Sequence, residues 1–220
     1  MKPSLLKILT LAILIILPFG YLYMIYPDLP QNVPLHYGSD MQPDRYGDKS
    51  EMWFPIILLM SVSLISYLLI TNIYKIDPKV SEDQPQTAMH KIAFAIVAFF
   101  SVISMYIIYS TVKGGSNSFL FVILGLLFAV LGNFMYNIKP NYFVGMRLPW
   151  TLNDDENWKQ THRIAGKVWV AGGIFICLLS FLVPVTWMLP AMMVTISILV
   201  LWPTLNSFMF YWNKKNVKDK

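Results

Sequence analysis

The chain has 220 residues, of which 56% are hydrophobic and 13% are charged, and its formal net charge is +5. A soluble domain carries about a quarter charged residues and most of its helices need a polar face, so this composition excludes an ordinary soluble bundle. Six segments of 18 to 23 residues contain no Asp, Glu, Lys or Arg, and each is long enough to cross a bilayer as a helix. We therefore predict an all-α membrane protein with about six transmembrane helices. The segments are Ile8–Tyr26, Met52–Tyr74, Ile92–Val112, Phe119–Ile138, Val168–Val185 and Leu189–Tyr211.

The distribution of lysine and arginine predicts how these helices are oriented. With a cytoplasmic N-terminus, fourteen of the seventeen basic residues fall on the cytoplasmic side, and three, Arg45, Lys49 and Lys113, fall outside. This bias follows the positive-inside rule. We expect a multi-pass protein with both termini in the cytoplasm, and we read the basic excess as an orientation signal rather than evidence of nucleic-acid binding.

The first connection, residues 27–51, is a 25-residue outer loop, here called the cap. Loops of this length are usually functional. His36, Asp40, Asp44 and Asp48 follow one another at intervals of four, but glycines and prolines between them argue against a continuous helix. Three readings stay open: turns and hydrogen bonds in a compact cap, a divalent-cation site of imidazole and carboxylates, or recognition of a peptide or other ligand. The net acidic charge of the cap favours cationic partners.

A second long connection, residues 139–167, is expected in the cytoplasm and is here called the signature loop. Asn153 suits an N-cap, with Glu156 in the capping-box position. This pattern predicts a short interfacial helix that runs into the fifth membrane segment. Trp150 and Trp158 suit the layer of lipid headgroups, where indole rings are favoured.

Amides and glycines of the fourth segment predict contacts between helices. Asn133, Asn137 and Asn141 recur at intervals of four, and Gly125 and Gly132 share one face. Buried amides bond to neighbouring helices, and small residues allow close packing within or between chains. The signature loop then either holds neighbouring helices together by hydrogen bonds, with Arg147 at the membrane interface, or forms a docking surface for a cytoplasmic partner.

Common enzyme motifs are missing from the sequence. It contains no His-Glu-x-x-His, no Gly-x-Ser-x-Gly and no glycine-rich phosphate loop. Its single cysteine, Cys177, cannot form a structural metal cluster. No charge lies within a membrane segment, whereas ion and proton pathways usually carry one. We expect no catalytic residue, no metal and no cofactor; a metal-dependent membrane enzyme or a small-solute transporter is the alternative.

Two sets of residues in the cap and the signature loop form a recognisable pattern. They are Leu29-Pro30, Val33-Pro34, His36-Tyr37, Pro43-Asp44-Arg45, Gly47 and Lys49 in the cap, and Asn141, Gly145, Arg147, Pro149-Trp150-Thr151-Leu152, Trp158, Thr161-His162 and Gly166 in the signature loop. With these elements the chain resembles the SdpI family of bacterial membrane proteins. Met41 stands where that family usually has glycine, which predicts a different turn if the glycine needs a positive φ. Leu148 replaces a common threonine.

The resemblance implies an immunity protein of the bacterial cell membrane that protects the producing cell against a secreted, membrane-active peptide toxin. It also implies a second role, in which the protein senses the toxin and sequesters a cytoplasmic transcriptional repressor at the membrane, without binding nucleic acid itself. The chain would divide into a helix pair with the cap, residues 1–74, and a four-helix part with the signature loop, residues 75–220. Toxin recognition is expected at His36, Asp40, Asp44, Arg45 and Lys49, and partner docking or a structural role at Asn141, Gly145, Arg147, Trp150, Thr151, Trp158 and His162.

Overall fold

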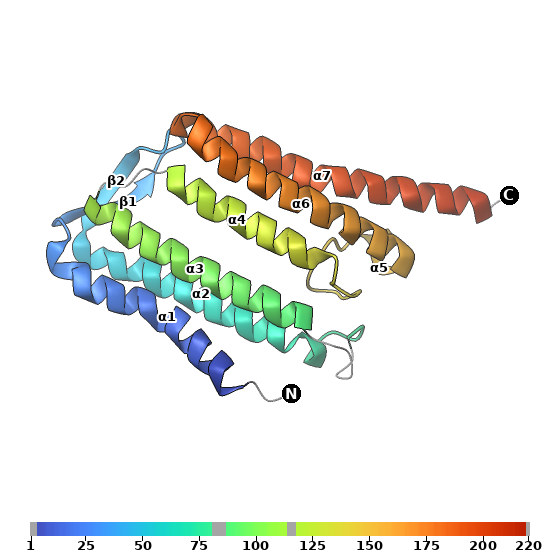
Figure 1. Cartoon of the computed structure of the whole chain (residues 1–220), viewed down its shortest axis with the longest axis horizontal. Helices are drawn as coiled ribbons and strands as arrows, with labels where there is room; N and C mark the ends of the chain where they lie inside the picture. Colours follow the sequence, from blue (N-terminus) through green and yellow to red (C-terminus); the bar gives the residue numbers. More distant parts are fainter. Residues whose placement is uncertain (1–3, 81–86, 114–117, 219–220) are drawn as a thin grey trace.

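The computed structural model describes residues 4–80, 87–113 and 118–218. Within these ranges six long helices form a bundle with a β-hairpin at one end (Figure 1). The long helices are α1 (Leu5–Ile25), α2 (Trp53–Thr71), α3 (Thr87–Lys113), α4 (Ser118–Met135), α6 (Asp155–Leu182) and α7 (Val185–Lys218). The shorter elements are β1 (Asn32–Tyr37), β2 (Pro43–Asp48), α5 (Pro149–Leu152) and three 3-10 turns, η1 (Tyr26–Asp28), η2 (Lys49–Met52) and η3 (Ile73–Lys75).

All six long helices are long and apolar enough to cross a membrane. Large apolar side chains also cover the outside of the bundle; Leu6, Phe181 and Leu182, for example, are each more than 70% exposed. An apolar surface of this extent is stable in lipid but not in water. The prediction of an all-α membrane protein with six transmembrane helices is therefore confirmed.

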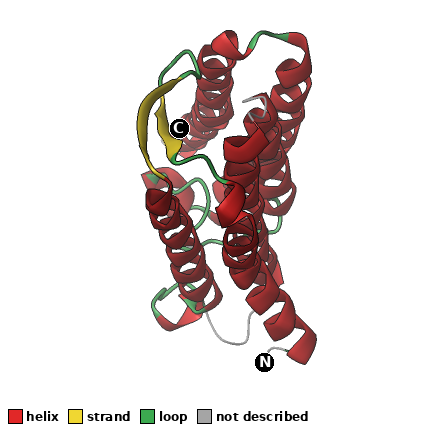
Figure 2. Ribbon diagram, turned by 90° about the vertical axis from the view of Figure 1, so that its left-hand side faces the viewer, coloured by secondary structure: helices red, strands yellow, loops and turns green. Residues whose placement is uncertain are grey.

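The bundle has two distinct ends (Figure 1). The hairpin lies at one, here called the hairpin end, and both chain termini point toward the other, here called the terminal end. The cap, which we expected as a loop of turns, thus contains two paired strands, and Figure 2 shows them beside the ends of the helices.

Close packing of α4 against α6 holds the C-terminal half together. A Cβ atom at Gly132 would lie 2.7 Å from the backbone nitrogen of Val170, and one at Gly125 would lie 2.6 Å from the carbonyl oxygen of Gly173. Both distances are too short for a side chain, so only glycine permits this helix separation. The predicted close packing at Gly125 and Gly132 is confirmed, and it occurs within the chain.

The predicted interfacial helix and the fifth membrane helix are one continuous helix, α6. Its N-cap is Asp154, whose carboxylate accepts hydrogen bonds from the amides of Glu156 (3.0 Å) and Asn157 (3.2 Å). The prediction of Asn153 as N-cap is wrong by one residue. The Asn153 side chain instead donates to the carbonyl of Pro149, the first residue of the preceding short helix α5.

Candidate functional site

The hairpin of the cap rests on an apolar base. Val33 of β1 is fully buried and packs with Leu29 and Met52 in a cluster that also includes residues of α1, α2 and α3. Across the hairpin Val33 pairs with Gly47, and Asn32 pairs with Asp48. The inward-facing side of β1 therefore fixes the cap to the N-terminal helices, while its other face stays accessible.

Asp48 joins the hairpin to the next helix. Its carboxylate accepts a hydrogen bond from the amide of Ser50 (2.9 Å), and Glu51 accepts one from the amide of Asp48 (3.0 Å), which completes a capping box at η2. The amide of Ser50 also holds the pKa of the Asp48 carboxyl below its ordinary value. Two of the acidic residues of the cap therefore have structural partners.

The five predicted recognition residues are spread over the hairpin. His36 Nδ1 lies 2.6 Å from Asp44 Oδ1, and both side chains are more than half exposed. Arg45 is opposite His36 in the strand register and is exposed. Asp40 accepts a hydrogen bond from the amide of Gln42 in the hairpin turn (3.0 Å). The Lys49 ammonium lies 5.1 Å from the centre of a ring on η1, that of Tyr26, rather than facing the other four residues.

A divalent-cation site in the cap would require its imidazole and carboxylate side chains to lie close together. Over residues 4–80, 87–113 and 118–218, no three His, Cys, Asp or Glu side chains are grouped so that they could hold a metal ion. The cap contributes the pair His36 and Asp44, in which the carboxylate already bonds to the imidazole.

Met41 connects the cap to the other half of the molecule. We expected methionine to require a different turn from glycine, yet Met41 itself adopts a φ of 61°. A non-glycine residue in this conformation costs about 1–2 kcal/mol. The side chain is buried against Phe121 of α4, Ile176 of α6 and Met188 of α7, and burying a methionine gains about 1.5–3 kcal/mol. Burial therefore offsets the strain and anchors the hairpin turn on the C-terminal helices.

The signature loop is organised from inside by Asn141, which is fully buried. Its Nδ2 donates to the carbonyls of Lys139 and Val144, both at 2.9 Å. Its Oδ1 accepts from the amides of Phe143 (2.8 Å) and Val144 (2.6 Å). Four bonds saturate this amide, so Asn141 replaces the regular secondary structure that residues 139–144 lack.

His162 and Thr151 fix the middle of the same loop. Nε2 of His162 accepts a hydrogen bond from the amide of Met146 (3.0 Å), while Nδ1 lies 2.9 Å from the carbonyl of Trp158. Since a carbonyl only accepts, Nδ1 carries the proton and the ring is neutral. Thr151 donates to the carbonyl of Met146 (2.8 Å) and accepts from the amide of Leu148 (2.9 Å). The loop is therefore held on both sides of Arg147.

Gly145 lies directly against the His162 ring. It has a φ of 111°, and a Cβ atom there would collide with Nε2 of His162. Two independent features therefore require glycine at this position: the positive φ and the lack of space for a Cβ atom beside the imidazole.

The proposed docking residues do not share one surface. We predicted Trp158 in the headgroup layer, but it is fully buried, and its indole donates to the carbonyl of Ile138 (2.8 Å). That prediction is wrong because a neighbouring helix end, rather than lipid, supplies the polar partner. Of the seven signature residues, Arg147 is exposed, Gly145 and Trp150 are half-buried, and the other four, Asn141, Thr151, Trp158 and His162, are buried.

Asp77, between α2 and α3, is a member of this site that the sequence did not reveal. It is buried, and its carboxylate accepts hydrogen bonds from the amides of Tyr142 (2.6 Å) and Lys79 (2.8 Å). The Lys79 ammonium lies 5.0 Å from the centre of the Tyr142 ring and donates to the carbonyl of Leu152. The only local signal is the Asp77-Pro78 pair, which is typical of a turn.

A second missed group joins α6 to α7. Oδ1 of Asn157 accepts from the hydroxyls of Ser207 (2.7 Å) and Thr161 (2.9 Å), and its Nδ2 donates to the carbonyl of Ser207 (3.1 Å). The indole of Trp150 donates to the same Ser207 hydroxyl (2.9 Å). Trp150 is thus directed toward α7 rather than toward a partner.

Comparison with known proteins supports the resemblance seen in the cap and in the signature loop. Residues 137–207 match the sequence profile of the SdpI/YfhL protein family, and residues 13–60 match that of a domain of unknown function, DUF1648. The chain is 24% identical over 202 residues to the immunity protein SdpI of Bacillus subtilis (strain 168), covering 90% of this chain and 93% of that protein. These matches confirm the resemblance inferred from the two loops. No solved structure matches the chain.

Proposed function

We propose that this chain is an immunity protein that protects the producing cell against a secreted, membrane-active peptide toxin. One observation carries the proposal: the 24% identity to an immunity protein extends over 90% of the chain. The matched family regions include the cap as well as the signature loop.

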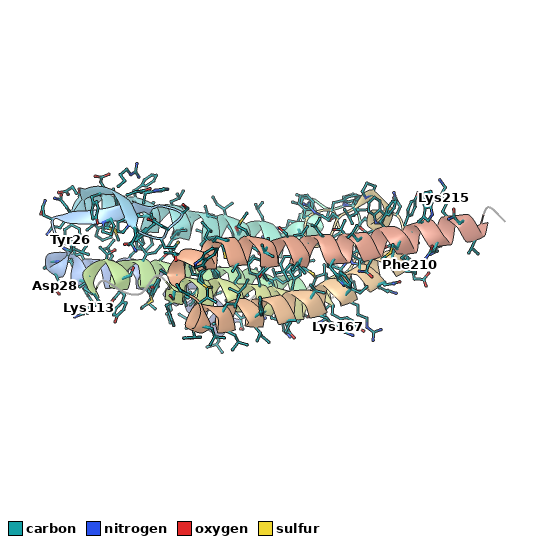
Figure 3. All side chains as sticks on the ribbon, turned by 90° about the horizontal axis from the view of Figure 1, so that it is seen from above. Tyr26, Asp28, Lys113, Lys167, Phe210 and Lys215 are labelled. Carbon is teal, nitrogen blue, oxygen red and sulfur yellow. The ribbon has the colours of Figure 1, made fainter. Side chains whose placement is uncertain are left out.

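The proposed orientation places the hairpin end outside the cell and the terminal end in the cytoplasm. Lys113 lies near the hairpin, whereas Lys167 and Lys215 lie toward the terminal end (Figure 3). The strong excess of basic residues toward the terminal end supports a cytoplasmic location for it. A toxin arriving from outside then meets the cap together with the neighbouring ends of α1 and α3 (Figure 1 and Figure 3).

The cap offers the toxin a polar, exposed surface. His36, Asp44 and Arg45 all have exposed side chains on the hairpin, and the paired His36 and Asp44 provide an imidazole and a carboxylate within one contact. Because the cap carries more acidic than basic residues, it favours a cationic peptide. We propose that this surface recognises the toxin. Asp40 would then shape the hairpin turn, and Lys49 would shape the side of the cap that rests on the helices.

A survival assay tests the proposal. The protein is expressed in a toxin-sensitive bacterium, which is challenged with a secreted peptide toxin while viability and membrane potential are recorded. We expect protection by the unchanged protein and at least a tenfold loss of survival for the His36→Ala/Asp44→Ala variant at equal membrane level. His90→Ala, at the terminal end, is the matched control and should protect fully. Absence of protection by the inserted, unchanged protein contradicts the proposed function.

Toxin sensing through a cytoplasmic repressor is the second proposed role. It is supported by an exposed patch on the signature loop, where Tyr142 and Phe143 are 42% and 47% exposed beside Arg147. Recovery of a bound regulator from membranes should change with toxin, and Tyr142→Ala/Phe143→Ala should abolish recovery. Tyr23→Ala/Met24→Ala, exposed on α1 near the hairpin end, is the control. Equal recovery with and without toxin contradicts a switch.

A further inference from the structure

A groove of about 580 Å³ lies between α4 and α6, toward the terminal end. Its lining includes Gly132 of α4 and Gly166 of α6, which are in close contact: a Cβ atom on either glycine would lie 2.9 Å from the carbonyl oxygen of the other. We infer that this groove binds an anionic phospholipid, with the phosphate at its terminal end and an acyl chain along its apolar wall. The inference is independent of the immunity function.

Two cations of α6 line the groove. Arg163 and Lys167 are one helical turn apart, and both side chains are exposed. Within the described ranges neither takes part in an ion pair; the acidic residues Asp154 and Glu156 at the start of α6 pair with Lys214. The groove therefore presents two uncompensated positive charges, which suit a phosphate.

The lining changes from polar to apolar along the helices. Asn133 of α4 and Tyr136, directly after its end, also line the groove and offer an amide and a phenol. One to two turns farther along α6 the lining becomes Val170, Ala171 and Ile174, all apolar. A phospholipid has the same order of groups, from phosphate through glycerol to hydrocarbon.

The position of the groove selects a lipid rather than a free phosphate. Lys167 is the last charged residue before the charge-free segment Val168–Val185, so the groove crosses the boundary between headgroups and hydrocarbon. Figure 3 shows Lys167 pointing away from the bundle, as expected for a side chain that reaches headgroups. Basic pockets between membrane helices on the cytoplasmic side are a known way to hold anionic lipids. A soluble anion would make no use of the apolar wall.

Native mass spectrometry of the detergent-purified full chain tests this inference. Phosphatidylglycerol is added, with phosphatidylcholine of the same acyl chains as the comparison. We expect one phosphatidylglycerol to bind at least tenfold more tightly than phosphatidylcholine. Arg163→Gln/Lys167→Gln should weaken its binding at least tenfold, whereas Lys75→Gln/Lys91→Gln, which removes two charges of the same end but outside the groove, should leave it unchanged.

Ala171→Trp provides a second, charge-neutral variant that fills the apolar wall at an exposed position. It should also weaken phosphatidylglycerol binding, and it decides the matter if the double glutamine variant fails to insert. Equal binding of the two lipids, or undiminished phosphatidylglycerol binding by Ala171→Trp, overturns the inference. Displacement of the lipid by millimolar inorganic phosphate would show a free-anion site and overturn it as well.

Discussion

The imidazole of His162 stacks on the indole of Trp158, with ring centroids 4.1 Å apart and an interplanar angle of 22°. Both rings are buried: the imidazole bonds to the amide of Met146 and the carbonyl of Trp158, and the indole donates to the carbonyl of Ile138, directly before the signature loop. The stacked pair therefore attaches the loop to α6. Residues that looked like a docking surface in the sequence form the interior that gives the loop its shape.

His162→Ala is expected to destabilise the protein substantially. The substitution leaves the amide of Met146 without its acceptor and opens a cavity beside Trp158, which together cost about 2–4 kcal/mol. Thermal unfolding in detergent, followed by size-exclusion chromatography, should show an earlier transition. His90→Ala removes a half-buried histidine of α3 and should change the transition little. Equal thermal stability of both variants would contradict a structural role for His162.

Gly145→Ala should be more harmful than an ordinary glycine substitution. Alanine at a φ of 111° is strained, and its Cβ would meet His162, so we expect a loss of about 2 kcal/mol or more. Gly20→Ala is the control, because nothing lies within 4 Å of a Cβ there and alanine favours a helix by about 1 kcal/mol. Thermal unfolding should therefore shift in opposite directions for the two variants. A shift in the same direction would contradict the proposed fit of glycine to histidine.

Asp154 predicts a component of stability that depends on pH. Burial alone raises its pKa, but hydrogen bonds from Lys214 and from the amides of Asn157 and Glu156 outweigh burial and lower the pKa below the ordinary 3.8. A lowered carboxyl pKa contributes stability that is present above about pH 4 and is lost as pH falls through the folded-state pKa. Unfolding temperatures measured from pH 6 to pH 3 should therefore fall more steeply with Asp154 than without it.

Two substitutions separate the roles of Asp154. Asp154→Asn keeps a good N-cap but removes the charge facing Lys214, whereas Asp154→Ala removes both and should cost about 1 kcal/mol. Asp154→Asn should lose the acid-dependent component and retain most of the stability at pH 7. If both variants have the same thermal stability at pH 7, the N-cap hydrogen bonds of residue 154 do not contribute as described.

Long, local patterns made the helices predictable. Each charge-free segment identifies its own helix without knowledge of its neighbours, and the shared face of Gly125 and Gly132 follows from helical periodicity alone. The hairpin was missed because its strands are six residues long and each contains a proline, Pro34 or Pro43. The two strands are neighbours in the sequence, but Met41 in the turn between them is buried against three C-terminal helices, a contact that local sequence cannot predict.

The interior of the signature loop was predicted poorly for a related reason. An indole that will reach lipid headgroups and one that will bond to a buried carbonyl have the same sequence signature, and Trp158 finds its partner 20 residues away at Ile138. The sequence gives no sign of the role of Asp77, because the amide of Tyr142, which donates to its carboxylate, is 65 residues away. Asn141 was read as inter-helix glue, whereas its bonds are all within residues 139–144.

Asp77→Ala tests whether the connection between α2 and α3 holds the signature loop in place. The variant removes the acceptor of two amides, those of Tyr142 and Lys79, and each buried amide left unsatisfied costs about 1–3 kcal/mol. Arg147 donates to the carbonyl of Tyr142 (2.5 Å), so loosening Tyr142 should also release Arg147. We expect faster tryptic cleavage after Arg147 in the detergent-solubilised variant.

Asp28→Ala is the control for this experiment, because it removes an exposed carboxylate at the hairpin end. It should leave the cleavage rate at Arg147 unchanged. Faster cleavage in Asp77→Ala alone would mean that a residue outside the SdpI/YfhL-matched region controls the exposed patch to which we assign partner binding. An unchanged rate in Asp77→Ala would mean that Asn141, Thr151 and His162 suffice to hold the loop without the connection between α2 and α3.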